Sequence, residues 1–157
     1  MFWRRKAFVV IRPLLADQAD DCARLHADAF AHAWSADEIA NLLALETIGV
    51  AALDTLSGAL HGFALSRISA DEAELLTITV ALNARRRGVG RAILNEILLR
   101  AATAGARAMF LEVNEDNSDA LALYNSLGFV KVAERTGYYL KSNGSRATAV
   151  VMRKHLS

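Results

Sequence analysis

Hydrophobic positions in the first part of the chain favour one strand followed by two helices. Phe8 to Ile11 is a short β-branched and aromatic run, which predicts a strand. Apolar residues from Ala19 to Phe30 then recur about every 3.6 positions, as they do on the buried face of a helix. Ser35 followed by Glu38 is typical of a capping box, so we expect a second helix to begin there.

From Ile48 the pattern changes to extended runs. Residues 48–53, 60–66 and 74–82 are apolar or alternate in polarity, and short polar segments separate them. Short connections favour antiparallel pairing between consecutive strands. We therefore expect these runs to form a meander.

The helical spacing returns at residues 92–101 and ends near Gly105, a common C-terminal stop. Ala108 to Val113 follows as a strand that is apolar on both faces, which is typical of a central strand. A strand, a helix and a further strand in this order form a crossover unit. The strands at 74–82 and 108–113 should therefore be parallel neighbours.

The last part of the chain predicts one short helix and two strands. Asn117 or Ser118 caps the helix, and Gly128 ends it. We expect the strands at residues 129–134 and 147–153, with residues 135–145 in the connection between them.

Composition then bounds the class of protein. The chain has 157 residues, of which 54% are hydrophobic and 22% charged, so we expect one globular domain over residues 1–157. A net charge of +1 gives no case for binding nucleic acid, and no apolar run has the length of a membrane span. Cys22, the one cysteine, should be a small buried hydrophobe; the lack of an internal disulfide fits a reducing, cytoplasmic compartment.

Candidate chemistry gathers in one stretch, Ala84–Ile93, where the third helix should begin. It combines three arginines with two glycines spaced as Gly88-x-Gly90. Glycines let a ligand approach the backbone, and the first turn of a helix has N–H groups without partners, so such a turn can bind a phosphate. The P-loop and dinucleotide-binding patterns are absent. From this stretch alone, an ordinary basic loop and helix cap is the alternative.

Two motifs resemble the GCN5-related N-acetyltransferase (GNAT) superfamily. Arg85-Arg-Arg-Gly-Val-Gly90 matches its signature Arg/Gln-x-x-Gly-x-Gly/Ala after a strand, and Leu111–Asn117 with Ala122–Phe129 resembles its later motif. Within the superfamily the chain is most similar to the bacterial RimI-type ribosomal-protein-alanine N-acetyltransferases. That likeness extends to three further stretches, at residues 33–35, 135–139 and 149–152.

This resemblance covers the chain from about Phe8 to Met152 and implies a fold. The fold class is mixed α/β, a mostly antiparallel twisted sheet of about seven strands with a parallel central pair, flanked by about four helices. Leu140 and Thr148 depart from the RimI-type pattern, which usually has Pro and Asp there. Both departures lie on the acceptor side.

The resemblance also implies acetyl-CoA as the co-substrate, with no metal. N–H groups of the turn would bind its pyrophosphate, arginines its adenosine phosphates, and the strand at 78–80 its pantetheine amides. For Asn117 a role as helix cap is compatible with cofactor contact. The implied cofactor-binding residues are Ile78, Thr79, Val80, Arg85, Arg86, Arg87, Gly88, Val89, Gly90, Arg91, Asn117 and Tyr124.

Acetyl transfer to an amine needs a base and an acid. A peptide α-ammonium has a pKa of about 7.7–8.0, so a base must take its proton. The resemblance makes Glu112 that base, and we expect apolar neighbours to favour its proton uptake. Tyr124 would protonate the leaving thiolate, and a backbone N–H at 78–80 would stabilise the oxyanion. An exposed glutamate and a core tyrosine are the alternatives.

For the acceptor, the resemblance implies the N-terminal alanine of a small-subunit ribosomal protein. Trp34, Tyr138 and Tyr139 would form the walls of a peptide groove, with Arg135 nearby; because side chains alternate along a strand, at most one tyrosine need point into it. Two alternatives are a GNAT enzyme that acetylates a small amine or a lysine side chain, and a non-catalytic acetyl-CoA-binding module.

Overall fold

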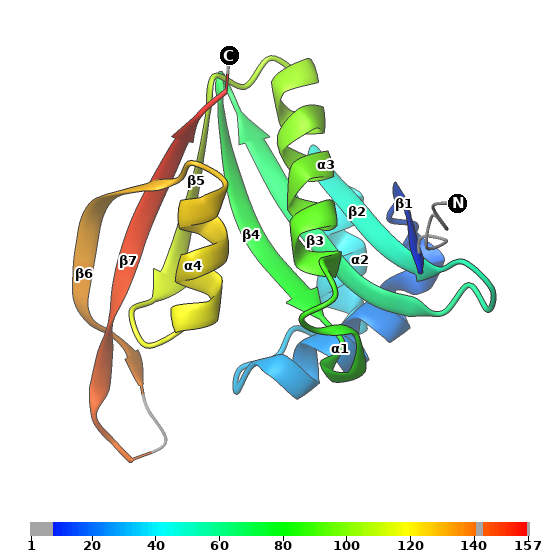
Figure 1. Ribbon diagram of the computed structural model, residues 1–157, viewed down its shortest axis with the longest axis horizontal. Helices are drawn as coiled ribbons and strands as arrows, with labels where there is room; N and C mark the ends of the chain where they lie inside the picture. The colour runs from blue at the N-terminus through cyan, green and yellow to red at the C-terminus, as the bar shows by residue number, and fades with distance from the viewer. Residues whose placement is uncertain (1–7, 141–142, 157) are drawn as a thin grey trace, which may run out of the picture. The chain divides into compact units, whose positions relative to one another are not determined.

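The computed structural model describes residues 8–140 and 143–156 (Figure 1). Within them every strand and helix that the sequence predicted is present, with ends shifted by a few residues. Two 3-10 turns, η1 (Ala16–Gln18) and η2 (Leu82–Ala84), precede the first and third α-helices. The other elements are β1 (Val9–Pro13), α1 (Ala19–Ala29), α2 (Ala36–Leu43), β2 (Thr47–Asp54), β3 (Leu60–Ser69), β4 (Glu72–Val80), α3 (Val89–Thr103), β5 (Ala108–Asn114), α4 (Ser118–Ser126), β6 (Val130–Leu140) and β7 (Arg146–His155).

The described strands form a seven-stranded sheet in the order β1-β2-β3-β4-β5-β7-β6. β4 and β5 are parallel, as the crossover through α3 predicted, while β1–β2, β2–β3, β5–β7 and β6–β7 are antiparallel. The predicted mixed α/β fold with a parallel central pair is therefore confirmed.

The chain divides into two compact units. Unit 1 runs from the first described residue to Arg67 and includes Leu76–Arg100. Unit 2 comprises Ile68–Leu75 and the chain from Ala101 onward. Unit 1 thus holds both N-terminal helices, the C-terminal part of β4 and most of α3, whereas unit 2 holds β5, α4, β6 and β7.

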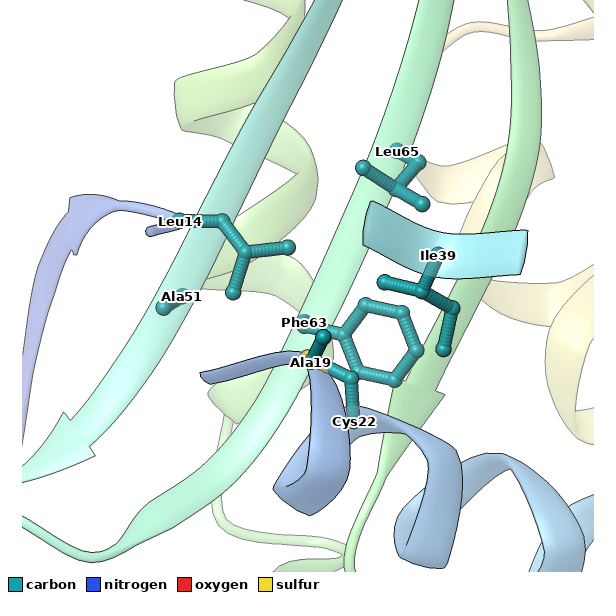
Figure 2. Packing of buried hydrophobic residues seen from close by; sticks show 7 residues of the cluster. All are labelled: Leu14, Ala19, Cys22, Ile39, Ala51, Phe63 and Leu65. Carbon is teal, nitrogen blue, oxygen red and sulfur yellow. The ribbon is translucent and has the colours of Figure 1, made fainter. Parts of the chain in front are cut away.

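Helices α1 and α2 bury their apolar faces in the core of unit 1 (Figure 2). α2 begins as predicted, because Ser35 Oγ accepts a hydrogen bond from the Glu38 amide at 3.1 Å. Burial raises the pKa of the Cys22 thiol to about 12, which confirms Cys22 as a buried hydrophobe. The core cluster consists of Leu14, Ala19, Cys22, Ile39, Ala51, Phe63 and Leu65.

The first turn of α3 packs closely on the sheet at Gly62 of β3. A Cβ atom on Gly62 would lie 2.9 Å from Ile93 Cδ1 and 2.9 Å from the Thr79 carbonyl oxygen, closer than packed atoms approach. Val89 and Ile93 of this turn are 2% and 0% exposed. The missing side chain thus allows α3 to start directly beside the end of β4.

β4 ends earlier than the sequence predicted. The apolar run was expected to stay extended to Leu82, but the strand stops at Val80. The Ala81 N–H still donates to the His61 carbonyl at 2.8 Å, after which the chain turns through η2. Leu82 is 65% exposed, so this end of the apolar run is not part of the core.

β6, by contrast, is longer than predicted. The sequence placed residues 135–139 in the connection between the last two strands. In the structure β6 continues to Leu140 and pairs with β7 on both sides of a register shift between Arg135 and Tyr139. Gly137 has a φ of 69°, and the resulting bulge accommodates these residues within the strand.

We expect Gly62→Ala to lower the free energy of unfolding by about 2–3 kcal/mol, because the new Cβ must displace Ile93 or the backbone of β4. Urea denaturation measures this change. Gly58→Ala is the matched control. Nothing lies within 4 Å of an added Cβ there, so its cost is only that of placing alanine at a φ of 75°, about 1 kcal/mol. Equal costs for the two variants would contradict the close packing at Gly62.

Candidate active site

In unit 1, the turn between β4 and α3 has an unusual backbone. Arg86 and Gly88 have φ values of 59° and 79°, and the helix begins directly afterwards at Val89. The Ala92 N–H donates to the Gly88 carbonyl at 3.0 Å, which closes the first helical turn. Residues 89–91 therefore carry the N–H groups that have no acceptor within the helix. N–H groups at a helix start that follows left-handed residues can bind an anion.

The arginine side chains of this turn are exposed but contact unit 1. Arg85 Nε donates to the Val80 carbonyl at 3.2 Å. The Arg87 guanidinium lies 3.5 Å from the centroid of the Phe8 ring, a cation–π contact, and Phe8 in turn packs 4.9 Å from the His61 ring. The guanidinium groups of Arg85 and Arg87 are therefore held against neighbouring residues of unit 1.

The end of β4 has polar groups that its neighbours do not satisfy. Within the described residues, the parallel ladder with β5 consists of three pairs, from Glu72–Ala108 to Glu74–Phe110. The Oγ1 atoms of Thr77 and Thr79 are buried without a hydrogen-bond partner. The strand segment at 78–80, predicted to bind the pantetheine, thus belongs to the part of β4 beyond that ladder.

Trp34 lies in the connection between α1 and α2 and packs, partly buried, against the core cluster. Its indole stacks on the imidazole of His26, with ring centroids 4.9 Å apart. Sequence reasoning did not identify this contact, because Trp34 lies in the connection after α1, where helical spacing gives no guide to neighbours.

In unit 2, Glu112 forms an ion pair with Arg135. The Glu112 Oε1 atom lies 3.2 Å from Arg135 Nη1, and the two side chains are 29% and 57% exposed. Glu112 is on β5 and Arg135 on β6, so the guanidinium reaches across β7, which lies between them. The sequence indicated only apolar neighbours for this carboxyl; the structure adds a cationic partner, because β6 returns beside β7 and brings Arg135 toward β5.

Tyr124 and Asn117 both have structural roles in α4. Tyr124 is 6% exposed, and its ring meets Phe129 edge-on at 5.7 Å and 63°. Asn117 Oδ1 accepts a hydrogen bond from the Ala120 amide at 3.2 Å, so Asn117 is the N-cap and Ser118 is the first helical residue. These contacts hold the Tyr124 phenol and the Asn117 amide in place.

The remaining acceptor residues lie in the β6–β7 hairpin. Tyr138 and Tyr139 belong to β6, and Tyr139 pairs with Ala147 of β7. The directions of the tyrosine side chains lie outside what the structure describes. The expected turn residues at 141 and 142 are likewise outside the described residues.

Each unit thus brings together one part of the predicted site. Unit 1 holds Trp34, residues 78–80 and the turn at 85–91; unit 2 holds Glu112, Asn117, Tyr124, Arg135 and the tyrosine pair. Among residues 8–140 and 143–156, no group of three or more His, Cys, Asp or Glu side chains is placed to hold a metal ion. No helix in this part of the chain has the length and apolar character needed to cross a membrane.

Comparison with known proteins gives the same family from sequence and from structure. The chain matches the model of the acetyltransferase (GNAT) family over residues 15–129. It is 37% identical over 98 residues to a ribosomal protein bS18-alanine N-acetyltransferase of Escherichia coli strain K12. This alignment covers 62% of the chain and 66% of that relative, just under two thirds of its length.

Two solved structures have the same fold. The ribosomal-protein-S18-alanine N-acetyltransferase from Escherichia coli superposes with a TM-score of 0.87 at 30% identity, over 95% of this chain and 94% of that one. Arabidopsis thaliana NAA60 in complex with acetyl-CoA superposes with a TM-score of 0.82 at 22% identity, over 94% and 98% of the two chains. The chain therefore belongs to the acetyltransferase (GNAT) family, which its Arg-x-x-Gly-x-Gly turn and its later motif predicted.

Proposed function

We propose that this GNAT protein transfers the acetyl group of acetyl-CoA to the N-terminal α-amine of a protein, with a ribosomal protein that begins with alanine as the acceptor. The observation that carries the proposal is the turn at 85–91, which presents left-handed residues and a helix start directly after β4. The relative from Escherichia coli K12, whose name specifies alanine of a ribosomal protein, supports the acceptor class.

The donor would bind to unit 1. N–H groups at 89–91 and the positive end of the α3 dipole would hold the pyrophosphate, and the arginines would add charge near it. The amides of the pantetheine arm would pair with backbone groups at 78–80, beyond the last β4–β5 pair. When bound, acetyl-CoA supplies the thioester carbonyl that the amine attacks.

Glu112 would act as the general base. Its carboxylate, which lies 3.2 Å from Arg135 Nη1, would accept a proton from the α-ammonium. Because Arg135 Nη1 contacts Oε1, the other carboxylate oxygen is left to take the proton directly or through a water. Arg135 would thereby serve the acceptor side indirectly, near the predicted groove residues Tyr138 and Tyr139.

Tyr124 would act as the general acid. The attack forms a carbon–nitrogen bond, and collapse of the tetrahedral intermediate breaks the carbon–sulfur bond, which leaves a thiolate that needs a proton. The buried phenol of Tyr124, held edge-on by Phe129, can donate that proton. A backbone N–H at 78–80 would stabilise the oxyanion of the intermediate.

The acceptor class is testable by mass spectrometry. We expect incubation with acetyl-CoA to acetylate the α-amine of peptides that begin with alanine, and to leave polyamines and internal lysines unmodified. Alanine peptides with a blocked N-terminus are the matched control. Modification of lysine side chains alone would favour the alternative of a lysine-directed or small-amine enzyme, and acetyl-CoA binding with no transfer to any acceptor would favour a binding module.

Glu112→Gln should lower kcat at least about 100-fold, because the amide cannot take the proton of the α-ammonium. The dissociation constant of acetyl-CoA, measured by calorimetry, should change less than about twofold, since Glu112 is not among the proposed cofactor-binding residues, most of which are in unit 1. Glu115→Gln alters a nearby carboxylate whose Oε1 accepts from the Thr148 amide at 3.4 Å, and it should keep near-normal turnover. Equal turnover in wild type and Glu112→Gln would overturn the assignment of the base.

Gly88→Ala should weaken acetyl-CoA binding about tenfold, because a φ of 79° is unfavourable for alanine and the turn must change its backbone. Calorimetry with acetyl-CoA measures the effect. Gly58→Ala places the same residue at a φ of 75° in a turn outside the site, so it should leave the affinity unchanged. An unchanged affinity in Gly88→Ala would remove the turn from the donor site.

A further inference from the structure

His26 is the centre of an aromatic stack that includes Trp34. It lies on α1 and is 3% exposed. Its ring centroid is 4.4 Å from Phe30 at an interplanar angle of 25°, and 4.9 Å from Trp34 at 14°. Phe63 of β3 lies 6.5 Å away on the core side. The imidazole is thus packed among three aromatic rings within unit 1.

His26 also makes hydrogen bonds with two residues of the connection between α1 and α2, Phe30 and Trp34. The His26 carbonyl accepts a hydrogen bond from the Phe30 amide at 2.9 Å, which ends α1. Its Nδ1 atom accepts one from the Trp34 amide at 3.1 Å. The next residue, Ser35, caps α2. The His26 side chain and the Ser35 cap therefore hold the C-terminal end of the connection between the two helices.

The hydrogen bond at Nδ1 requires a neutral imidazole with its proton on Nε2, because a protonated ring has no lone pair there. Burial lowers the pKa of His26, and the charge of Glu38 on α2 opposes this effect. Burial is the larger cause, so the ring stays neutral at physiological pH and the acceptor atom is available.

We propose that His26 is a positioning residue for acceptor binding: by accepting the Trp34 amide and stacking on the indole, it holds the connection at 30–35 in the conformation that receives the acceptor peptide. This inference rests on the proposed function, in which Trp34 is a wall of the acceptor groove. His26 itself touches neither the thioester nor the amine. Its loss should therefore affect the acceptor KM more than kcat or the affinity for acetyl-CoA.

Two substitutions separate the hydrogen bond from the stack. His26→Phe keeps an aromatic ring but leaves the Trp34 amide without its acceptor, and should raise the KM for an alanine-initiated peptide about tenfold at constant pH. His26→Asn places Oδ1 where Nδ1 lies and should recover part of that loss. His155→Phe alters an exposed histidine outside this connection and should leave the acceptor KM unchanged.

The expected result is a split between the two substrates, with the KM for acetyl-CoA and kcat within about twofold of wild type in all variants. An unchanged acceptor KM in His26→Phe, or an equal loss for both substrates, would overturn the proposal.

A fluorescence titration tests the contact between His26 and Trp34 without requiring activity. In a Trp3→Phe background Trp34 is the only tryptophan, and a stacked imidazolium quenches indole emission.

Emission should fall in a single step below pH 6.5, the ordinary pKa of histidine, because burial moves the His26 titration downward. The step should disappear in His26→Asn. It should persist in His32→Phe, which removes the exposed histidine of the same connection. A flat titration with His26 present would contradict the proposal even if the phenylalanine variant fails to fold. If the wild type acetylates none of the alanine peptides, the proposed function fails instead, while the titration still reports on the contact.

Discussion

The close packing of α3 on β3 at Gly62 is the constraint on which the turn at 85–91 depends. An anion-binding turn is effective only if its N–H groups are already oriented, since each immobilised group otherwise costs free energy on binding. The buried side chains of Val89 and Ile93 fix the first turn of α3, and Gly62 provides the room for them. Because the helix start is anchored in the core of unit 1, the preceding turn can hold Arg86 at a φ of 59°.

The charges of the two units are arranged differently. In unit 1, Arg85, Arg86 and Arg87 lie in one exposed turn, where solvent screens their charge. In unit 2 the carboxylate of Glu112 is paired with one guanidinium that approaches from two strands away. The bulge of β6 that follows Arg135 changes the path of that strand, so the geometry of the ion pair is linked to the path of the hairpin.

Much of the fold could be predicted from the sequence because its signals are local. Ser35 and Asn117 cap their helices by contacts that span three residues, and the crossover from β4 through α3 follows from spacing alone. Individual side-chain pairs and the extent of a ladder between distant segments could not be predicted. The pairing of Glu112 with Arg135, and the end of the β4–β5 ladder after Glu74, depend on which strands become neighbours.

The boundaries of β4 and β6 illustrate the same difference in opposite directions. Leu82 has the hydrophobicity of a strand residue but is 65% exposed, because the chain must leave the sheet to start α3. Thr136 and Gly137 have the composition of a turn but lie within β6, where pairing with β7 continues past the bulge. In both cases the tertiary structure overrides the local preference. The chain leaves the sheet before Leu82 to start α3, and pairing with β7 keeps Thr136 and Gly137 within β6.

Under the proposed function, the features that select the acceptor are held by few polar contacts. The proposed acceptor residues lie outside the turn at 85–91, in the connection at 30–35 and in the β6–β7 hairpin. The connection is held to α1 through the Nδ1 atom of His26, and Arg135 at the bulge of β6 is paired with Glu112 on β5. Because a single unsatisfied polar group costs about 1–3 kcal/mol, one substitution at either contact suffices to change acceptor affinity while the donor site keeps its geometry.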